Sequence, residues 1–223
     1  MLRVALTGGV GSGKSTAAAM LRECGAYLSQ SDEIGRALMQ PGGAAFAAIV
    51  QQFGAGVVKA DGSLDRAALA RISFDEGRVE ELNSIVHPLV IAEQARWAAE
   101  IAAKDPLAVA VVESALVFET KHAASAEDAA PWRTRFDRIV VVTAPEEQRR
   151  WRYIQRVSGL DEAAAAADFD RRNAAQWSDE RKAALADYVI ANDDSLAELR
   201  DEVQTLWEIL KRESAERAGE AMY

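Results

Sequence analysis

A glycine-rich segment near the N-terminus carries the clearest chemistry in the sequence. Residues 8–15 read Gly-Gly-Val-Gly-Ser-Gly-Lys-Ser and satisfy the pattern G-x-x-x-x-G-K-[ST] of a phosphate-binding loop. The glycines allow backbone N–H groups to turn inward and phosphate oxygens to approach closely. Four constrained residues at fixed spacing, between a strand-like and a helix-like segment, favour this interpretation over a ligand-free turn. The predicted nucleotide-binding residues are Gly9, Gly11, Ser12, Gly13, Lys14, Ser15 and Thr16, with Lys14 also catalytic and Ser15 a Mg²⁺ ligand.

Two carboxylates follow strand-like runs further along the chain. Asp32 lies just before Glu33–Leu38, so it could be only the N-cap of a helix. It could also point into the crevice where the carboxyl ends of parallel strands meet, beside the phosphate loop. Glu113 closes another apolar run and is either a ligand in the Mg²⁺ site or a solvated residue at a strand end. The residues alone leave both choices open.

Arginines gather on one predicted helix of an otherwise acidic protein. Arg149, Arg152 and Arg156 occupy positions i, i+3 and i+7, so their guanidinium groups can share one helix face. Such a face can neutralise a phosphoryl group in transfer, as a lid or an arginine finger does. The alternative is a solvated face paired with Glu146 and Glu147. We favour the functional interpretation, in which Arg152 is catalytic.

The elements that must position these residues are short apolar runs separated by helical segments. This alternation is typical of a parallel sheet that is buried on both faces, and it predicts an α/β fold. The expected strands are Val4–Thr7, Ala26–Ser29, Ala108–Glu113, Arg138–Thr143 and Tyr188–Ala191.

Two insertions interrupt this alternation. About eighty residues separate the second and third strands, far more than the dozen or so that a crossover helix needs. We expect a helical lobe there, with a helix starting at His87-Pro88. Two further helices, over 146–157 and 161–177, form a hairpin, and a last helix spans 195–212. The predicted domains are a core of 1–31, 105–145 and 178–213, a lobe of 32–104, a lid of 146–177 and a flexible tail of 214–223.

Composition narrows the class of protein. The 223 residues carry 26 Lys+Arg against 35 Asp+Glu, a net charge of −9, which argues against a surface that grips nucleic acid. Cys24 is the single cysteine, so no intramolecular disulfide can form. No apolar run approaches the ~20 residues that span a bilayer. We expect a cytoplasmic protein that binds small molecules and neither nucleic acid nor membranes; a monomer is expected, with an oligomer left open.

The motifs together, in their order and spacing from Leu2 to Arg212, resemble those of the dephospho-CoA kinase family. The matching stretches are Ala5–Thr16, Ser31–Arg36, Phe53-Gly54, Asp61–Arg66, His87-Pro88, Leu116–Glu119, Arg152, Arg156, Gln176 and Ala186–Asn192. Three stretches depart from the family pattern. Gln30-Ser31-Asp32 replaces Asp-Ala-Asp, so that one carboxylate is missing; Ala115-Leu116-Val117 replaces Pro-Leu-Leu; and Val157 stands where an acidic residue is common.

The resemblance implies a P-loop NTPase-type three-layer sandwich with a five-stranded parallel sheet, a helical acceptor-binding insertion and a helical lid. It implies that ATP, with Mg²⁺, phosphorylates the ribose 3′-hydroxyl of dephospho-coenzyme A. Asp32 would face that hydroxyl, and the other acceptor contacts would be Arg66, His87, Leu116 and Gln176. Arg149, Arg156 and Asn192 would contact the nucleotide, and Ser15 and Glu113 the metal.

Two other functions compete with this one. The chain could be a kinase for another small acceptor, such as a nucleoside or nucleoside monophosphate, although the large insertion and His87-Pro88 speak against it. It could instead be a nucleotide-binding switch or regulatory ATPase, which would show acceptor-independent hydrolysis and assign no use to the lid arginines.

Overall fold

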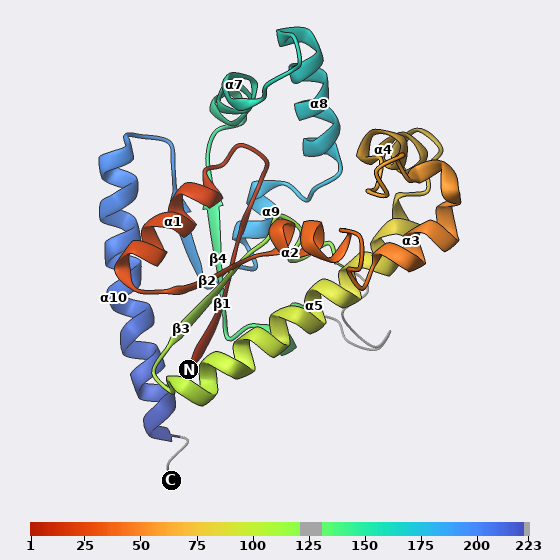
Figure 1. Cartoon of the computed structure of the whole chain (residues 1–223). Helices are drawn as coiled ribbons and strands as arrows, with labels where there is room; N and C mark the ends of the chain where they lie inside the picture. The colour runs from red at the N-terminus through yellow and green to blue at the C-terminus, as the bar shows by residue number, and fades with distance from the viewer. Residues whose placement is uncertain (121–130, 221–223) are drawn as a thin grey trace. The chain divides into compact units, whose positions relative to one another are not determined.

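The computed structural model, which describes residues 1–120 and 131–220, contains a five-stranded parallel sheet (Figure 1). The strand order is β2-β3-β1-β4-β5; β1 pairs in parallel with β3 and β4, and β4 pairs in parallel with β5. The strands are β1 (Leu2–Gly8), β2 (Tyr27–Gln30), β3 (Val109–Glu113), β4 (Arg138–Thr143) and β5 (Tyr188–Ala191). All five expected strands are confirmed, to within two residues at each end.

Two helices, α1 (Lys14–Cys24) and α10 (Leu196–Glu220), cover one face of the sheet. Alternate residues of β1, namely Leu2, Val4 and Leu6, pack into one buried cluster with Leu21 of α1 and Leu210 of α10. Alternation places every second side chain of a strand on the same face, so these three residues all face the helices. Each Å² of apolar surface that this packing removes from water stabilises the fold by about 25 cal/mol.

The chain divides into two compact units. The first comprises Met1–Ser29, Ala98–Glu119 and the chain from Trp132 onward, and it contains the body of the sheet. The second consists chiefly of Gln30–Trp97 and is helical. Its elements are α2 (Ser31–Leu38), α3 (Phe46–Phe53), the 3₁₀ turn η1 (Ala55–Val57), α4 (Arg66–Asp75) and most of α5 (Val79–Lys104). Ile49, Phe53 and Leu69 belong to a separate buried cluster of this unit.

The expected helix start at His87-Pro88 is wrong, because α5 runs through it from Val79 to Lys104. Pro88 has no N–H to donate, so the helix loses one backbone hydrogen bond there. Apolar side chains on both sides of the proline nevertheless pack inward: Leu82 and Leu89 contact the core of the helical unit. Tertiary packing therefore sustains a helix that local propensity would interrupt.

The remaining helices follow β3 and β4, and all of their residues except Pro131 belong to the first unit. They are α6 (Pro131–Arg135), α7 (Glu146–Arg156), α8 (Glu162–Ala174) and α9 (Asp179–Ala183). The helices α7 and α8 are the expected hairpin, whereas the short helix α9 was not expected. In the described part of the chain, no helix combines the length and apolarity needed to cross a bilayer.

The last helix is longer than the sequence indicates. α10 continues to Glu220 instead of ending near Arg212, so residues 214–220 are helical where a flexible tail was expected, and 221–223 lie outside the described residues. Ser214 is fully buried, and its hydroxyl lies 2.9 Å from the carbonyl oxygen of Leu107 and 3.0 Å from that of Ala108. This contact fastens the end of α10 to the chain entering β3.

Ser214→Ala should lower the free energy of unfolding by about 1–2 kcal/mol, because it leaves the Leu107 carbonyl without the Ser214 hydroxyl. Thr205→Ala is the matched control, since Thr205 is exposed and its hydroxyl donates to Asp201 O within the same helix. That control should stay within about 0.5 kcal/mol of the parent. Urea unfolding followed by circular dichroism measures both values, and equal changes would show that the end of α10 is not anchored.

Candidate active site

The glycine-rich loop joins β1 to α1 and takes backbone conformations that suit glycine. Gly11 has a φ of 79° and Gly13 a φ of 94°, a region that other residues rarely adopt. A Cβ atom on Gly13 would lie 2.1 Å from Nδ2 of Asn192, so the loop also needs glycine for space. α1 begins at Lys14 directly after Gly13, without a side-chain cap. The positive end of the helix dipole therefore faces the loop, as in known phosphate sites.

Two residues of the expected metal site lie together. Ser15 Oγ donates a hydrogen bond of 2.9 Å to Glu113 Oε1 at the end of β3. Nearby in the loop, Lys14 Nζ donates to Gly9 O at 2.8 Å. Among the described residues, no three His, Cys, Asp or Glu side chains form a metal-binding group. A hydroxyl and one carboxylate fit Mg²⁺, which takes most of its remaining ligands from nucleotide phosphates and water.

Asn192 connects the loop to the chain after β5. Its side chain is buried and donates from Nδ2 to Ser12 O at 2.8 Å. Arg152 of α7 donates from Nη1 to the carbonyl oxygen of Asn192 at 2.8 Å, and from Nη2 to Gln148 Oε1 at 3.1 Å. The two predicted site residues Arg152 and Asn192 are thus in contact with each other.

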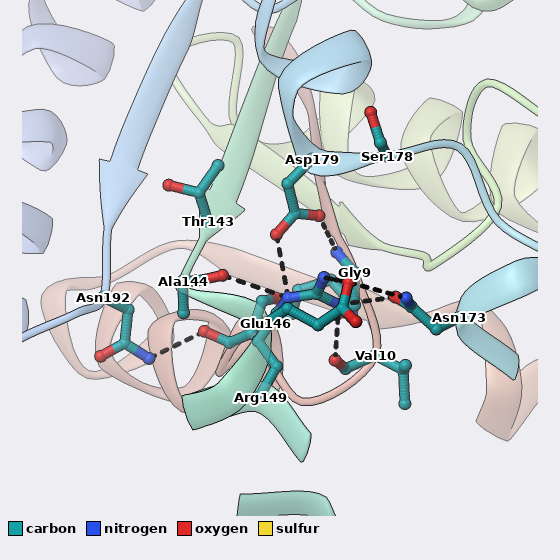
Figure 2. Close-up of polar contacts among 12 residues, drawn as sticks. Gly9, Val10, Thr143, Ala144, Glu146, Arg149, Asn173, Ser178, Asp179 and Asn192 are labelled. Atoms are coloured by element: carbon teal, nitrogen blue, oxygen red, sulfur yellow. Dashed lines mark hydrogen bonds and ion pairs between the residues drawn. The ribbon is translucent and has the colours of Figure 1, made fainter. Parts of the chain in front are cut away.

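Arg149 is the most buried of the three predicted arginines, with a side chain only 6% exposed. Figure 2 shows its guanidinium group surrounded by oxygen atoms. Nε donates to Ala144 O at 3.1 Å, and Nη1 donates to Val10 O at 3.2 Å and to Asn173 Oδ1 at 2.9 Å. Arg156 is exposed, and its guanidinium lies 5.8 Å from the Tyr153 ring centroid. The arginines therefore have separate environments despite their common spacing.

The hairpin of α7 and α8 is held together at Asp168. Its carboxylate accepts hydrogen bonds from the Tyr153 hydroxyl and, at 2.8 Å, from Arg172 Nε. Burial of Asp168 raises its pKa. The hydrogen bonds from Tyr153 and Arg172 lower the pKa by more than burial raises it, so that it falls to about 2. The carboxylate therefore stays ionised across the physiological range, and its stabilisation is lost only in strong acid.

Asp179 is a site residue that sequence reasoning missed. Its Oδ1 accepts a 2.9 Å hydrogen bond from the backbone N–H of Gly9, and its Oδ2 lies 3.4 Å from Arg149 Nε (Figure 2). Asp179 is the first residue of α9, which is capped by Ser178. A serine followed by two acidic residues does indicate a helix start, but nothing in it points to a loop 170 positions away.

Lys182, on the same short helix, is fully buried. Its Nζ lies 3.1 Å from Glu119 Oε1 and donates to Ala115 O at 3.1 Å. Glu119 Oε1 also accepts from the backbone N–H of Trp177 at 2.8 Å. Glu119, which ends one of the stretches that match the family, thus pairs with the buried lysine.

The predicted acceptor residues are divided between the two units. Leu116 and Gln176 belong to the unit that contains the glycine-rich loop, and both are half-buried. Arg66 begins α4, and His87 lies within α5, both in the helical unit.

Asp32 also belongs to the helical unit, as the second residue of α2. The N-cap interpretation of Asp32 is wrong, because Gln30 occupies that position and no side chain caps the helix. The Asp32 carboxylate is exposed, and no hydrogen bond or ion pair joins it to any other residue that the structure describes.

Comparison with known proteins decides the family. The model of the dephospho-CoA kinase family matches residues 2–198. The chain belongs to the dephospho-CoA kinase family. A dephospho-CoA kinase of Symbiobacterium thermophilum is 42% identical over 92% of this chain and 79% of its own length. One of Mycolicibacterium paratuberculosis is 41% identical over 93% of this chain, which spans only 47% of that relative.

Solved structures agree on the fold. The crystal structure of TT1252 from Thermus thermophilus has a TM-score of 0.71 and 30% identity, with 94% of this chain and 97% of that chain covered. The dephospho-CoA kinase from Campylobacter jejuni has a TM-score of 0.57 at 21% identity, over 93% of this chain and 96% of its own. This α/β fold of P-loop kinases, the P-loop being the glycine-rich loop of residues 8–15, confirms the expected fold class.

Gly13→Ala should weaken ATP binding by about tenfold or more, because the new methyl group would displace the Asn192 amide that holds the loop at Ser12. Gly62→Ala is the matched control: Gly62 has a φ of 83° and open space around its Cβ position. Both substitutions cause a backbone strain of about 1–2 kcal/mol, because both positions have a positive φ, but only Gly13→Ala also creates a steric clash. Calorimetric titration with a non-hydrolysable ATP analogue measures the affinities; equal affinities would mean that the Asn192 contact does not shape the loop.

Proposed function

We propose that this dephospho-CoA kinase family member transfers the γ-phosphoryl group of ATP to the ribose 3′-hydroxyl of dephospho-coenzyme A, which gives coenzyme A and ADP. The observation that carries this proposal is the pairing of Ser15 with Glu113 at 2.9 Å, next to Lys14 in an intact P-loop, in a chain of this family. The reaction is the last step of coenzyme A biosynthesis. We expect the enzyme to act as a monomer in the cytoplasm on small molecules alone.

On the donor side, the P-loop wraps the β- and γ-phosphates with its backbone N–H groups. Lys14 supplies a flexible positive charge to the same oxygens, and the start of α1 adds its dipole. Thr16 and Asn192 complete the nucleotide contacts. Ser15 and Glu113 would hold Mg²⁺, which when bound neutralises charge on the β- and γ-oxygens.

On the acceptor side, Asp32 orients the 3′-hydroxyl and accepts its proton late in the transfer. Phosphoryl transfer passes through a loose transition state, so positioning contributes more than early proton removal. The exposed carboxylate of Asp32, which no described residue binds, supports this role. Arg66, His87, Leu116 and Gln176 are the remaining proposed contacts with dephospho-coenzyme A.

Charge on the phosphoryl group in transfer is neutralised by arginines of the hairpin formed by α7 and α8. Arg152 is the proposed catalytic arginine, and Arg156 assists in binding ATP. Arg152 is half-buried and bonded to Asn192 O, close to the P-loop contact of that residue. Arg156 is exposed on the same helix, where a ligand can reach it.

Asp32→Asn should lower kcat for coenzyme A formation by about 10²-fold or more while the affinity for ATP stays nearly unchanged, because only the acceptor loses its orienting base. Lys14→Ala should also abolish most turnover. Glu33→Gln is the matched control, since Glu33 is the neighbouring exposed carboxylate in the first turn of α2. A chromatographic assay of ATP-dependent conversion of dephospho-coenzyme A measures turnover. Near-parental turnover of Asp32→Asn would refute its assigned role.

Failure of the parent enzyme in that assay would refute the proposed function. A panel of nucleosides and nucleoside monophosphates with labelled ATP would then identify another acceptor. ATP hydrolysis at the same rate with and without any acceptor would instead indicate a regulatory ATPase.

Arg152→Ala should lower kcat more than it weakens the binding of dephospho-coenzyme A, because its charge acts on the group in transfer; a loss of about 10²-fold is expected. Arg150→Ala is the control on the same helix, where Arg150 pairs with Asp170 at a distance of 3.4 Å. Steady-state kinetics with both substrates varied separates the two effects. Equal losses in kcat and in acceptor affinity would make Arg152 a binding residue only.

A further inference from the structure

We propose that Arg149 and Asp179 form a buried latch that fixes the P-loop to the base of the α7–α8 hairpin. In this proposal Arg149, which the family resemblance implies to be a nucleotide contact, is instead a positioning residue that acts through the loop and does not touch the nucleotide. This inference rests on the proposed use of the loop to bind ATP, but it does not depend on which acceptor is phosphorylated.

The burial of the two side chains is the first observation. Arg149 is 6% exposed and Asp179 is 9% exposed. Removing a carboxylate and a guanidinium from water costs several kcal/mol per ion unless each finds a partner. Arg149 Nε lies 3.4 Å from Asp179 Oδ2, and that oxygen accepts no hydrogen bond from any described residue. The buried charge of Asp179 therefore depends on Arg149 for its compensation.

The second observation is that the oxygen atoms around Arg149 come from separate segments. Its hydrogen bonds reach Val10 in the P-loop, Ala144 after β4, and Asn173 at the end of α8. Glu146 Oε2 lies 3.7 Å from Nη2. A guanidinium group has five N–H donors in a fixed plane, so a phosphate could be bound only if contacts within this set were broken. The geometry therefore favours a structural use of these donors.

The third observation is the fit of the P-loop against the pair. Asp179 Oδ1 accepts the Gly9 N–H at 2.9 Å. A Cβ on Gly9 would lie 2.6 Å from Arg149 Nη1 and 2.7 Å from Asp179 Oδ1, and a Cβ on Gly11 would lie 2.3 Å from Arg149 O. Two glycines of the P-loop thus pack directly against the latch, so a displacement of Arg149 or Asp179 would move the loop.

Removal of one partner should damage nucleotide binding more than removal of both. Arg149→Met leaves the Asp179 charge buried and unpaired, and it removes the hydrogen bonds that Arg149 donates to Val10 O and Asn173 Oδ1. Asp179→Asn keeps an oxygen for the Gly9 N–H but removes the negative charge. In the double variant no unpaired charge remains, so the P-loop should recover part of its position.

The test is a double-mutant cycle on the affinity for ADP and on steady-state kinetics. Arg149→Met should weaken ADP binding and raise the KM for ATP about tenfold, with kcat at saturating ATP within about threefold of the parent. The double variant Arg149→Met/Asp179→Asn should bind ADP several-fold more tightly than Arg149→Met alone. Arg150→Met is the matched control and should bind ADP as the parent does, since Arg150 is a neighbour on the same helix whose side chain is 44% exposed.

Two results would overturn the latch. One is a fall in kcat of about 10²-fold for Arg149→Met with no rescue by Asp179→Asn, which is expected of an arginine that contacts the phosphoryl group. The other is additivity of the two substitutions in the cycle, which would show that the residues do not act together.

If Arg149→Met does not fold, Arg149→Lys takes its place in the cycle, because lysine keeps the charge but cannot reach the same set of oxygens. It should weaken ADP binding several-fold, and parental affinity would overturn the latch. ADP binding is measured without acceptor, so a wrong acceptor would leave this test unchanged.

Discussion

A phosphate-binding loop must present its backbone to the ligand, and this loop can do so only because it carries few side chains. Gly9, Gly11 and Gly13 leave no Cβ atoms in the way, but these three positions also offer no side chain that could hold this part of the loop in place. The structure meets this constraint from outside the loop. Asp179 binds the N–H of Gly9, Arg149 binds the carbonyl of Val10, and Asn192 binds the carbonyl of Ser12.

The parts of the site that the sequence reveals are those set by local patterns. The P-loop, the five strands and the hairpin helices each have a spacing or composition that identifies them without knowledge of the rest of the chain. The closeness of Ser15 and Glu113 also follows from sequence, because Glu113 ends one parallel strand and the P-loop that leads to Ser15 follows another, and such strand ends meet at the same edge of a sheet. The supporting contacts could not be found in this way: Asp179 lies 170 positions from Gly9, and Asn192 lies 180 positions from Ser12.

Where the predictions from sequence are wrong, packing between distant segments outweighs a local signal. Pro88 marks a helix start by its chemistry, yet Leu82 and Leu89 keep α5 continuous through it. The polar residues after Arg212 indicate a loose tail, yet the hydroxyl of Ser214 is buried against the chain that enters β3. Asp32 has the residue type of an N-cap, but the helix begins at Ser31, so the N-cap position falls two residues earlier, on Gln30.

The short helix α9 carries two buried charges that point to different parts of the enzyme. Asp179 reaches the P-loop, and Lys182, three residues later, reaches Ala115 and Glu119 in the segment that contains Leu116. A five-residue helix cannot bend between these positions, so α9 is a rigid connection between the P-loop and the segment after β3. A change in the position of the P-loop during evolution would therefore also move the segment after β3, so the positions of the two segments could change only together.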